Sequence, residues 1–228
     1  MQQHLAFGKD GITIDLPPGF QYQILDRRSA SSLEDPATAI AQALDSPIGC
    51  PPLQELARGR RSAAIAVCDI TRPAPNRQIL PHVLSRLEQG GIPRNRILIL
   101  IATGLHRGAT PEEIQEICGD EIASSYTILN HDARAASDHR YLGTTTGGTP
   151  AYVDERFVAA DLRMTLGLIE PHLMLGFSGG RKMVAPGLAG QETIKTIHSP
   201  RFMRDARAVE AVSYTHLTLP TKAADEGL

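Results

Sequence analysis

The sequence predicts an α/β protein with an open, mostly parallel sheet flanked by helices, Rossmann-like in arrangement, and a short antiparallel hairpin at the N-terminus. Three observations support this prediction. Residues 63–67 and 97–101 are almost unbroken apolar runs, which is typical of strands that helices cover on both faces. Residues 78–87 carry apolar side chains at helical spacing, so the three segments form a β-α-β unit. Residues 12–16 and 22–25 alternate like paired strands, and a Pro-Pro-Gly turn joins them.

Two predicted helices begin with capping signals. Asp35 suits the N-cap position and Pro36 the first helical position, which opens a helix that extends through residue 43. Thr110, Pro111 and Glu113 have the spacing of a capping box, which predicts a helix through residue 118. The other predicted elements are a short helix over residues 53–57 and strands over residues 126–129 and 162–169.

Composition excludes several classes of protein. The 228 residues are 42% hydrophobic and 21% charged, as in an ordinary globular protein, and the net charge of -2 gives no footprint for nucleic acid or an anionic membrane. The sequence lacks an apolar stretch of about 20 residues and a secretory signal, so we expect a cytoplasmic protein. Three widely spaced cysteines, Cys50, Cys68 and Cys118, predict neither a disulfide framework nor a paired metal knuckle.

Polar clusters follow three of the predicted strands. They lie at residues 69–73, 103–107 and 170–172. Ligands of open parallel sheets bind outside the carboxyl ends of the strands. If the strands are parallel, we expect the three clusters to share one rim.

A glycine-rich turn follows the last of these clusters, within residues 170–187. Its small residues allow backbone N–H groups to approach an anion, and two cations stand beside them. The residues concerned are Gly176, Ser178, Gly179, Gly180, Arg181 and Lys182. A surface turn with solvated cations explains the same residues, and the spacing differs from that of a Walker A loop.

Single residues at the rim allow two interpretations each. Asp69 and Arg72 could form a structural ion pair, or Arg72 could bind a substrate carboxylate through its planar fork. His106 and His172 could be ordinary histidines, but their shared position after strand ends favours a catalytic role. His198 is expected near the end of a short helix, and as a metal ligand it needs partners from elsewhere in the chain.

Together these motifs resemble the N-terminal domain of the nickel-dependent lactate racemase family. The motifs are DITRP at residues 69–73, ATGLHR at 102–107, EPHLMLGFSGGRKMVAPG at 170–187 and TIHS at 196–199. The resemblance extends over residues 12–208. It implies an isomerase that interconverts the two forms of a 2-hydroxy acid such as lactate.

The resemblance also implies a cofactor, the nickel-pincer nucleotide, which is a pyridinium-derived mononucleotide that carries nickel. By this resemblance, Lys182 is the covalent attachment lysine, and His198 is the protein ligand to nickel. The glycine-rich turn would hold the nucleotide phosphate. The implied cofactor contacts are Thr71, Gly176, Ser178, Gly179, Gly180 and Arg181.

The same resemblance implies roles for the substrate-binding residues. His106 and His172 are the expected acid/base pair on the two sides of a 2-hydroxy acid, because an imidazole pKa lies near neutral pH. Arg72 would hold the substrate carboxylate, with Asp69 supporting the site. The alternatives are a non-catalytic module that binds a nucleotide phosphate, and a racemase or epimerase for a different hydroxy acid.

The family's chains are about twice as long as this one. We therefore expect residues 1–211 to form the N-terminal cofactor-binding domain, and the family's C-terminal domain to be missing. Residues 212–228 are expected to be non-native or disordered, with an edge strand over residues 214–219 as the alternative. The expected partners are the substrate, the proteins that build the cofactor and the missing domain, and we expect the fragment alone to be inactive.

Overall fold

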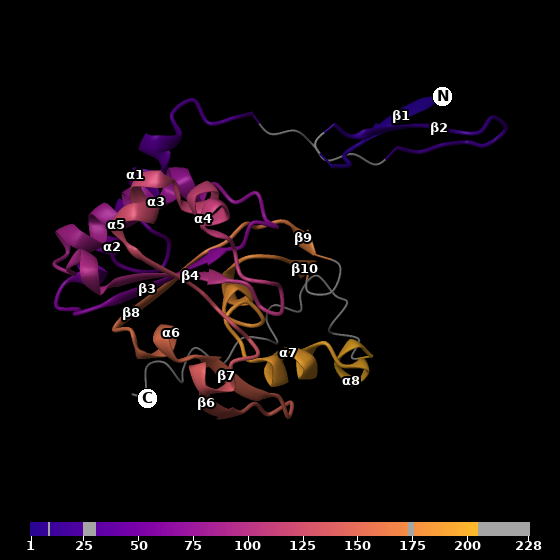
Figure 1. Cartoon of the computed structure of the whole chain (residues 1–228). Coiled ribbons are helices and arrows are strands. Elements are labelled where there is room, and N and C mark those ends of the chain that lie inside the picture. The colour runs from indigo at the N-terminus through magenta and orange to yellow at the C-terminus, as the bar shows by residue number, and fades with distance from the viewer. Residues whose placement is uncertain (9, 25–30, 173–175, 205–228) are drawn as a thin grey trace. The chain divides into compact units, whose positions relative to one another are not determined.

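The computed structural model describes residues 1–8, 10–24, 31–172 and 176–204. The chain divides into two compact units, Met1–Glu34 and Asp35–Leu228. Both are drawn in Figure 1, where the first is indigo.

The first unit contains the expected antiparallel hairpin. Strand β2 (Ile12–Asp15) pairs with β1 (Gln2–Leu5), whereas the predicted pairing with residues 22–25 is wrong. Residues 22–24 form no strand, and residue 25 lies outside the described residues. Gly11, at a φ of 72°, closes the turn by donating its N–H to the Phe7 carbonyl over 2.8 Å. The turn of this hairpin therefore lies before β2, where Gly11 adopts a positive φ, and not at the Pro-Pro-Gly segment after β2.

The second unit is built on a four-stranded parallel sheet, which confirms the predicted fold class. The strand order is β5-β4-β3-β8, so the chain first moves outward from β3 and then returns to its other side. The strands of this sheet are β3 (Ala63–Cys68), β4 (Ile97–Ala102), β5 (Thr127–Asn130) and β8 (Leu162–Leu166). A crevice forms at such a switch in strand order, here between the loops that follow β3 and β8.

Helices and a hairpin cover the two faces of this sheet (Figure 1). The α-helices are α1 (Pro36–Asp45), α2 (Leu53–Ala57), α3 (Asn76–Gln89), α4 (Pro111–Cys118), α5 (Asp120–Ser125), α6 (Glu155–Ala159), α7 (Gln191–Ile197) and α8 (Pro200–Met203). The short 3₁₀ helices are η1 (Arg94–Arg96), η2 (Ala136–Asp138) and η3 (Gly180–Met183). Two hairpins remain, β6 (His139–Thr144) with β7 (Pro150–Asp154), and β9 (Pro171–His172) with β10 (Gly176–Phe177).

The two faces have separate cores. Side chains at alternate positions of β3 show this division, because Ile65 and Val67 pack with α2 and α3, whereas Ala64 and Ala66 pack with Phe157 and the η3 region. All six residues of β3 are buried, as the unbroken apolar run predicted. The central strand is therefore fixed from both sides, and so is the loop that follows it.

The predicted helix caps are present. Asp35 Oδ1 accepts a hydrogen bond from the Thr38 N–H over 3.1 Å at the start of α1. Thr110 and Glu113 form the reciprocal capping box of α4, with bonds of 3.3 and 2.8 Å. In the part of the chain that the structure describes, no helix is long and apolar enough to cross a membrane.

Candidate functional site

A cavity of about 430 Å³ lies at the carboxyl ends of the sheet strands. Its walls come from the loops after β3, β4 and β8, from η3 and from α7. Eight of the predicted site residues line it, namely Asp69, Thr71, Arg72, His106, Ser178, Gly179, Lys182 and His198. The expectation of one shared rim is confirmed, because β3, β4 and β8 are parallel.

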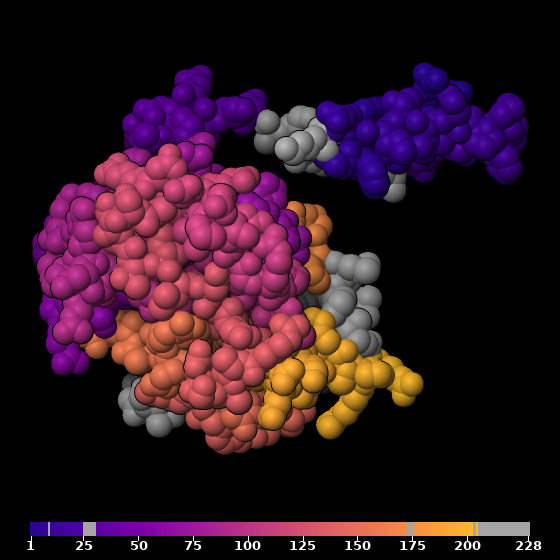
Figure 2. Space-filling model, viewed as in Figure 1, coloured from indigo at the N-terminus to yellow at the C-terminus, as the bar shows by residue number. Residues whose placement is uncertain are grey.

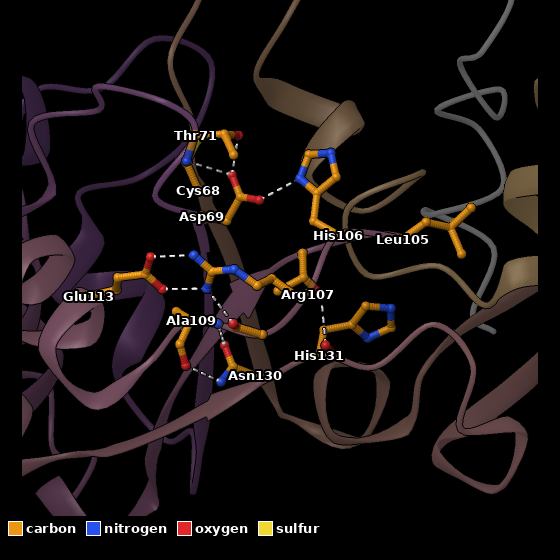
Figure 3. Close-up of polar contacts among 12 residues, drawn as sticks. Cys68, Asp69, Thr71, Leu105, His106, Arg107, Ala109, Glu113, Asn130 and His131 are labelled. Carbon is orange, nitrogen blue, oxygen red and sulfur yellow. Dashed lines mark hydrogen bonds and ion pairs between the residues drawn. The ribbon is translucent and has the colours of Figure 1, made fainter. Parts of the chain in front are cut away.

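Asp69 and His106 form a hydrogen-bonded pair in this cavity (Figure 3). Asp69 is buried, and its Oδ2 lies 2.6 Å from His106 Nδ1, while its Oδ1 accepts hydrogen bonds from the Thr71 N–H and hydroxyl. An ionised carboxylate only accepts, so His106 Nδ1 carries the hydrogen, and in the neutral ring the lone pair is on Nε2. With 59% of its side chain exposed, His106 can receive a proton from a ligand at Nε2.

Arg72 pairs with Glu170 and not with Asp69. Its Nη1 lies 3.4 Å from Glu170 Oε1, with the two side chains 42% and 40% exposed. The Asp69–Arg72 ion pair, one of the two interpretations that the sequence allowed, does not form, because Asp69 uses both oxygens on Thr71 and His106. Arg72 remains on the cavity wall, where a guanidinium can bind a carboxylate.

Lys182 brings an unusually weak base to the cavity. Burial and the nearby charge of Arg72 lower its pKa from 10.5 to about 8, while Glu170 acts in the opposite direction. About half of this amine is therefore neutral at pH 8. A neutral amine is a nucleophile, whereas an ammonium group is not.

The glycine-rich turn is shaped by close backbone contacts. Gly179 adopts a φ of 74°, and a Cβ on it would lie 3.0 Å from the Leu168 carbonyl oxygen. A Cβ on Gly167 would lie 2.8 Å from the Gly179 Cα, so the turn rests directly on the end of β8. The Ser178 hydroxyl donates to the Leu168 carbonyl over 2.5 Å and accepts from the Glu170 N–H over 3.0 Å. These contacts set the position of η3 and hence of Lys182.

His198 caps the C-terminal end of α7, which confirms the expected position at the end of a short helix. Its Nδ1 lies 2.8 Å from the Ile194 carbonyl oxygen, which can only accept, so Nδ1 carries the hydrogen. In the neutral ring, the lone pair is then on Nε2, and His198 lines the cavity. Histidines that bind metals commonly donate the other N–H to a carbonyl in this manner. Figure 2 shows α7 and α8 in yellow on the surface of the molecule.

Four predicted site residues do not line the cavity. They are His172, Gly176, Gly180 and Arg181. Burial and the charges of the cavity residues Lys182 and Arg72 lower the pKa of His172. It lies in β9, opposite Gly176 of β10.

The sequence analysis assigned no individual role to three residues of the site region. Lys195 of α7 lines the cavity, and Glu170 holds Arg72. His131 is fully buried behind the cavity, where its Nδ1 lies 2.9 Å from Asp154 Oδ2. His131 directly follows β5, so the rule that selected His106 at the end of β4 could have selected it as well.

The donor set constrains which metal group could bind. Among the described residues, no three histidine, cysteine, aspartate or glutamate side chains are close enough to hold a metal ion together. One histidine with an available Nε2, His198, lies on the same cavity as a weakly basic amine, Lys182. The arrangement of the described residues fits a metal whose other ligands belong to an organic group, and these residues do not form an all-protein metal centre.

The family model of the lactate racemase N-terminal domain matches residues 7–210. The lactate racemase of Thermoanaerobacterium thermosaccharolyticum is 35% identical over 209 residues, 90% of this chain and 48% of the relative. That of Lactiplantibacillus plantarum is 39% identical over 169 residues, 74% of this chain and 40% of the relative. The chain thus spans about half the length of the curated relatives it matches.

Solved structures agree with the fold. The lactate racemase apoprotein of T. thermosaccharolyticum superposes with a TM-score of 0.81 at 33% identity, over 93% of this chain and 49% of that one. A protein from Thermotoga maritima has a TM-score of 0.58 at 21% identity, over 74% of this chain and 40% of that one, and shows the fold alone.

Proposed function

Because this chain belongs to the lactate racemase N-terminal domain family, we propose that it is the cofactor-binding and substrate-binding part of a 2-hydroxy-acid racemase, with lactate as the first substrate to test. The observation that carries the proposal is the cavity. It gathers a guanidinium, a carboxylate-oriented imidazole and a weakly basic amine, from Arg72, His106 and Lys182. A module that only binds a nucleotide phosphate has no need for the Asp69–His106 pair.

In this proposal, the chain's own residues orient the substrate and move its protons. Arg72 binds the carboxylate of the hydroxy acid, which fixes the α-carbon in the cavity. His106 Nε2 takes the hydroxyl proton, and Asp69 stabilises the imidazolium that results. His172 serves as the second acid/base group, on the opposite side of the substrate. Its lowered pKa favours the neutral form that accepts a proton.

We propose the nickel-pincer nucleotide as the cofactor, with Lys182 as its attachment point and His198 Nε2 as its protein ligand to nickel. When bound, this group supplies the hydride acceptor that a hydroxy acid needs to pass through a planar 2-oxo acid. Its remaining contacts are proposed at Thr71, Gly176, Ser178, Gly179, Gly180 and Arg181. Thr71, Ser178 and Gly179 line the cavity, which supports their part of this assignment.

We also propose that residues 1–211 are one domain of a larger enzyme. A second domain, corresponding to the other half of the relatives' length, would close the cavity and exclude water. Residues 212–228 lie outside the described residues, and we propose that they do not belong to this domain. The 228-residue chain alone is then expected to be inactive.

The test begins with the reading frame beyond residue 208 in the source DNA. The complete protein is produced together with the cofactor-building proteins, and the conversion of D-lactate to L-lactate is followed by chiral chromatography. We expect His106→Ala to abolish turnover while the nickel content stays unchanged, and the matched control His82→Ala on α3 to retain activity. Equal loss of turnover and nickel in His106→Ala would contradict the acid/base role. An enzyme loaded with nickel that leaves lactate unchanged would contradict lactate as the substrate.

A further inference from the structure

Glu170 has a fixed place at the rim of the cavity. Its N–H donates to the Ser178 hydroxyl over 3.0 Å, and its carbonyl accepts the Ser178 N–H over 2.9 Å. Both ends of this residue's backbone are therefore tied to the glycine-rich turn. The carboxylate extends from a backbone that the turn holds in position.

The carboxylate of Glu170 lies among cations. Its Oε1 is 3.4 Å from Arg72 Nη1, and its charge acts on both Lys182 and His172. The carboxylate that lines the cavity itself, Asp69, is buried and bonded to Thr71 and His106. Of these two carboxylates, Glu170 is thus the one that can exchange its partner.

The Arg72–Glu170 pair is suited to such exchange. Both side chains are about two-fifths exposed, and a pair in that environment gains little net free energy from its own attraction. A planar guanidinium binds any carboxylate in the same way, whether it belongs to a side chain or to a ligand.

We propose that Glu170 is a placeholder, which occupies on Arg72 the position that the carboxylate of a 2-hydroxy acid takes, and which is released beside His172 when that ligand binds. This inference rests on the proposed role of Arg72 in binding the substrate. Exchange conserves charge on Arg72, since one carboxylate replaces another. The negative charge of Glu170 then remains near His172 and Lys182, where it favours the protonated imidazole.

The test measures binding of sodium D-lactate and L-lactate to the whole chain by NMR titration. Glu170→Gln removes the competing charge and keeps the shape, so lactate is expected to bind about two- to fivefold more tightly. Lactamide, which carries no charge, is expected to bind the variant and the wild type equally. The matched control is Glu155→Gln, because the Arg140–Glu155 pair has nearly the same exposure, 47% and 43%, away from the cavity.

The outcomes separate this inference from the proposed function. Lactate binding that Glu170→Gln leaves unchanged or weakens would overturn the placeholder role and show a structural ion pair. Lactate binding that is absent in the wild type, or that survives Arg72→Gln, would instead overturn the proposed carboxylate site. In the ligand-free chain, the pKa of His172 is expected to fall in Glu170→Gln, and an unchanged value would contradict the effect on His172.

Discussion

Two histidine–carboxylate pairs lie at the carboxyl ends of the neighbouring strands β4 and β5. His106 lies 2.6 Å from Asp69, on the cavity, with 59% of its side chain exposed. His131 lies 2.9 Å from Asp154, and both side chains are 0% exposed. Pairing with a carboxylate is therefore not enough to identify an acid/base histidine.

The second ring nitrogen makes the difference. His131 Nε2 lies 3.0 Å from the Ala189 carbonyl oxygen, which only accepts, so both nitrogens of this ring are engaged. Asp154 is engaged as well. Although burial raises its pKa, the hydrogen bonds from Arg156 and His131 hold it well below the usual range. This pair therefore fixes the segment before α7, whereas the pair of His106 and Asp69 leaves Nε2 for chemistry.

The largest expected effect comes from Asp154→Asn. This change removes the buried charge that pairs with Arg156, whose side chain is 31% exposed, and weakens the contact with His131. We expect the free energy of unfolding to fall by about 3–5 kcal/mol, measured by urea denaturation. Asp161→Asn, which breaks the exposed pair with Arg61, is the control and should cost less than about 1 kcal/mol. Similar losses in the two variants would mean that the buried network is not a structural anchor.

Asp69→Asn should change stability little and lower activity strongly, in contrast to Asp154→Asn, whose main effect is on stability. The amide oxygen of the introduced asparagine can still accept from Thr71, so we expect the free energy of unfolding to change by about 1 kcal/mol or less. In the complete two-domain enzyme, the rate constant kcat should fall by about 10²–10³-fold, because the His106 imidazolium loses its counter-charge. A variant that is strongly destabilised but turns over normally would reverse the roles of the two pairs.

Much of the fold could be predicted because its signals are local. The apolar run of β3, the capping box of α4 and the Asp35 cap each depend on a few neighbouring residues. The N-terminal hairpin was assigned to the wrong partner because two turn-forming segments flank β2, and alternation alone does not choose between them. Turn geometry, in particular the positive φ of Gly11, decided the pairing.

The sequence predicted where the site residues lie in the fold, but it did not predict which side chains contact one another. Parallel strands bring their carboxyl ends together, so Asp69, His106 and the glycine-rich turn could be placed on one edge of the sheet. The partner of each side chain depends on packing between distant segments. For that reason the sequence could not choose Glu170 over Asp69 as the partner of Arg72, and it assigned no role to His131.

Lys182 is half-buried, so its exposure lies between that of His106 and that of the fully buried His131. Its effect on the free energy of unfolding should depend on pH. Its pKa falls from 10.5 to about 8 on folding, so the unfolded chain binds more protons between these pH values. Stability therefore rises with pH in this window relative to Lys182→Met, in which the charge is absent. At pH 7 the methionine variant should be more stable, by up to about 3 kcal/mol and less where solvent screens the charge. Urea denaturation at pH 7 and pH 10 measures the difference, and a gap that does not change with pH would show an ordinary solvated lysine.

The smallest change in stability should come from Thr103→Val. Together with its control, this variant compares a buried and an exposed threonine hydroxyl that each donate to a backbone carbonyl. The buried Thr103 hydroxyl donates to the His131 carbonyl over 2.7 Å, and valine keeps the shape but leaves that carbonyl without this donor. We expect a loss of about 1 kcal/mol in the free energy of unfolding. The control is Thr196→Val on α7, where the hydroxyl donates to the Glu192 carbonyl over 2.8 Å in an exposed position and water can replace it. If both variants lose the same stability, burial does not distinguish these hydrogen bonds, and the contrast between the two histidine pairs would need a different physical basis.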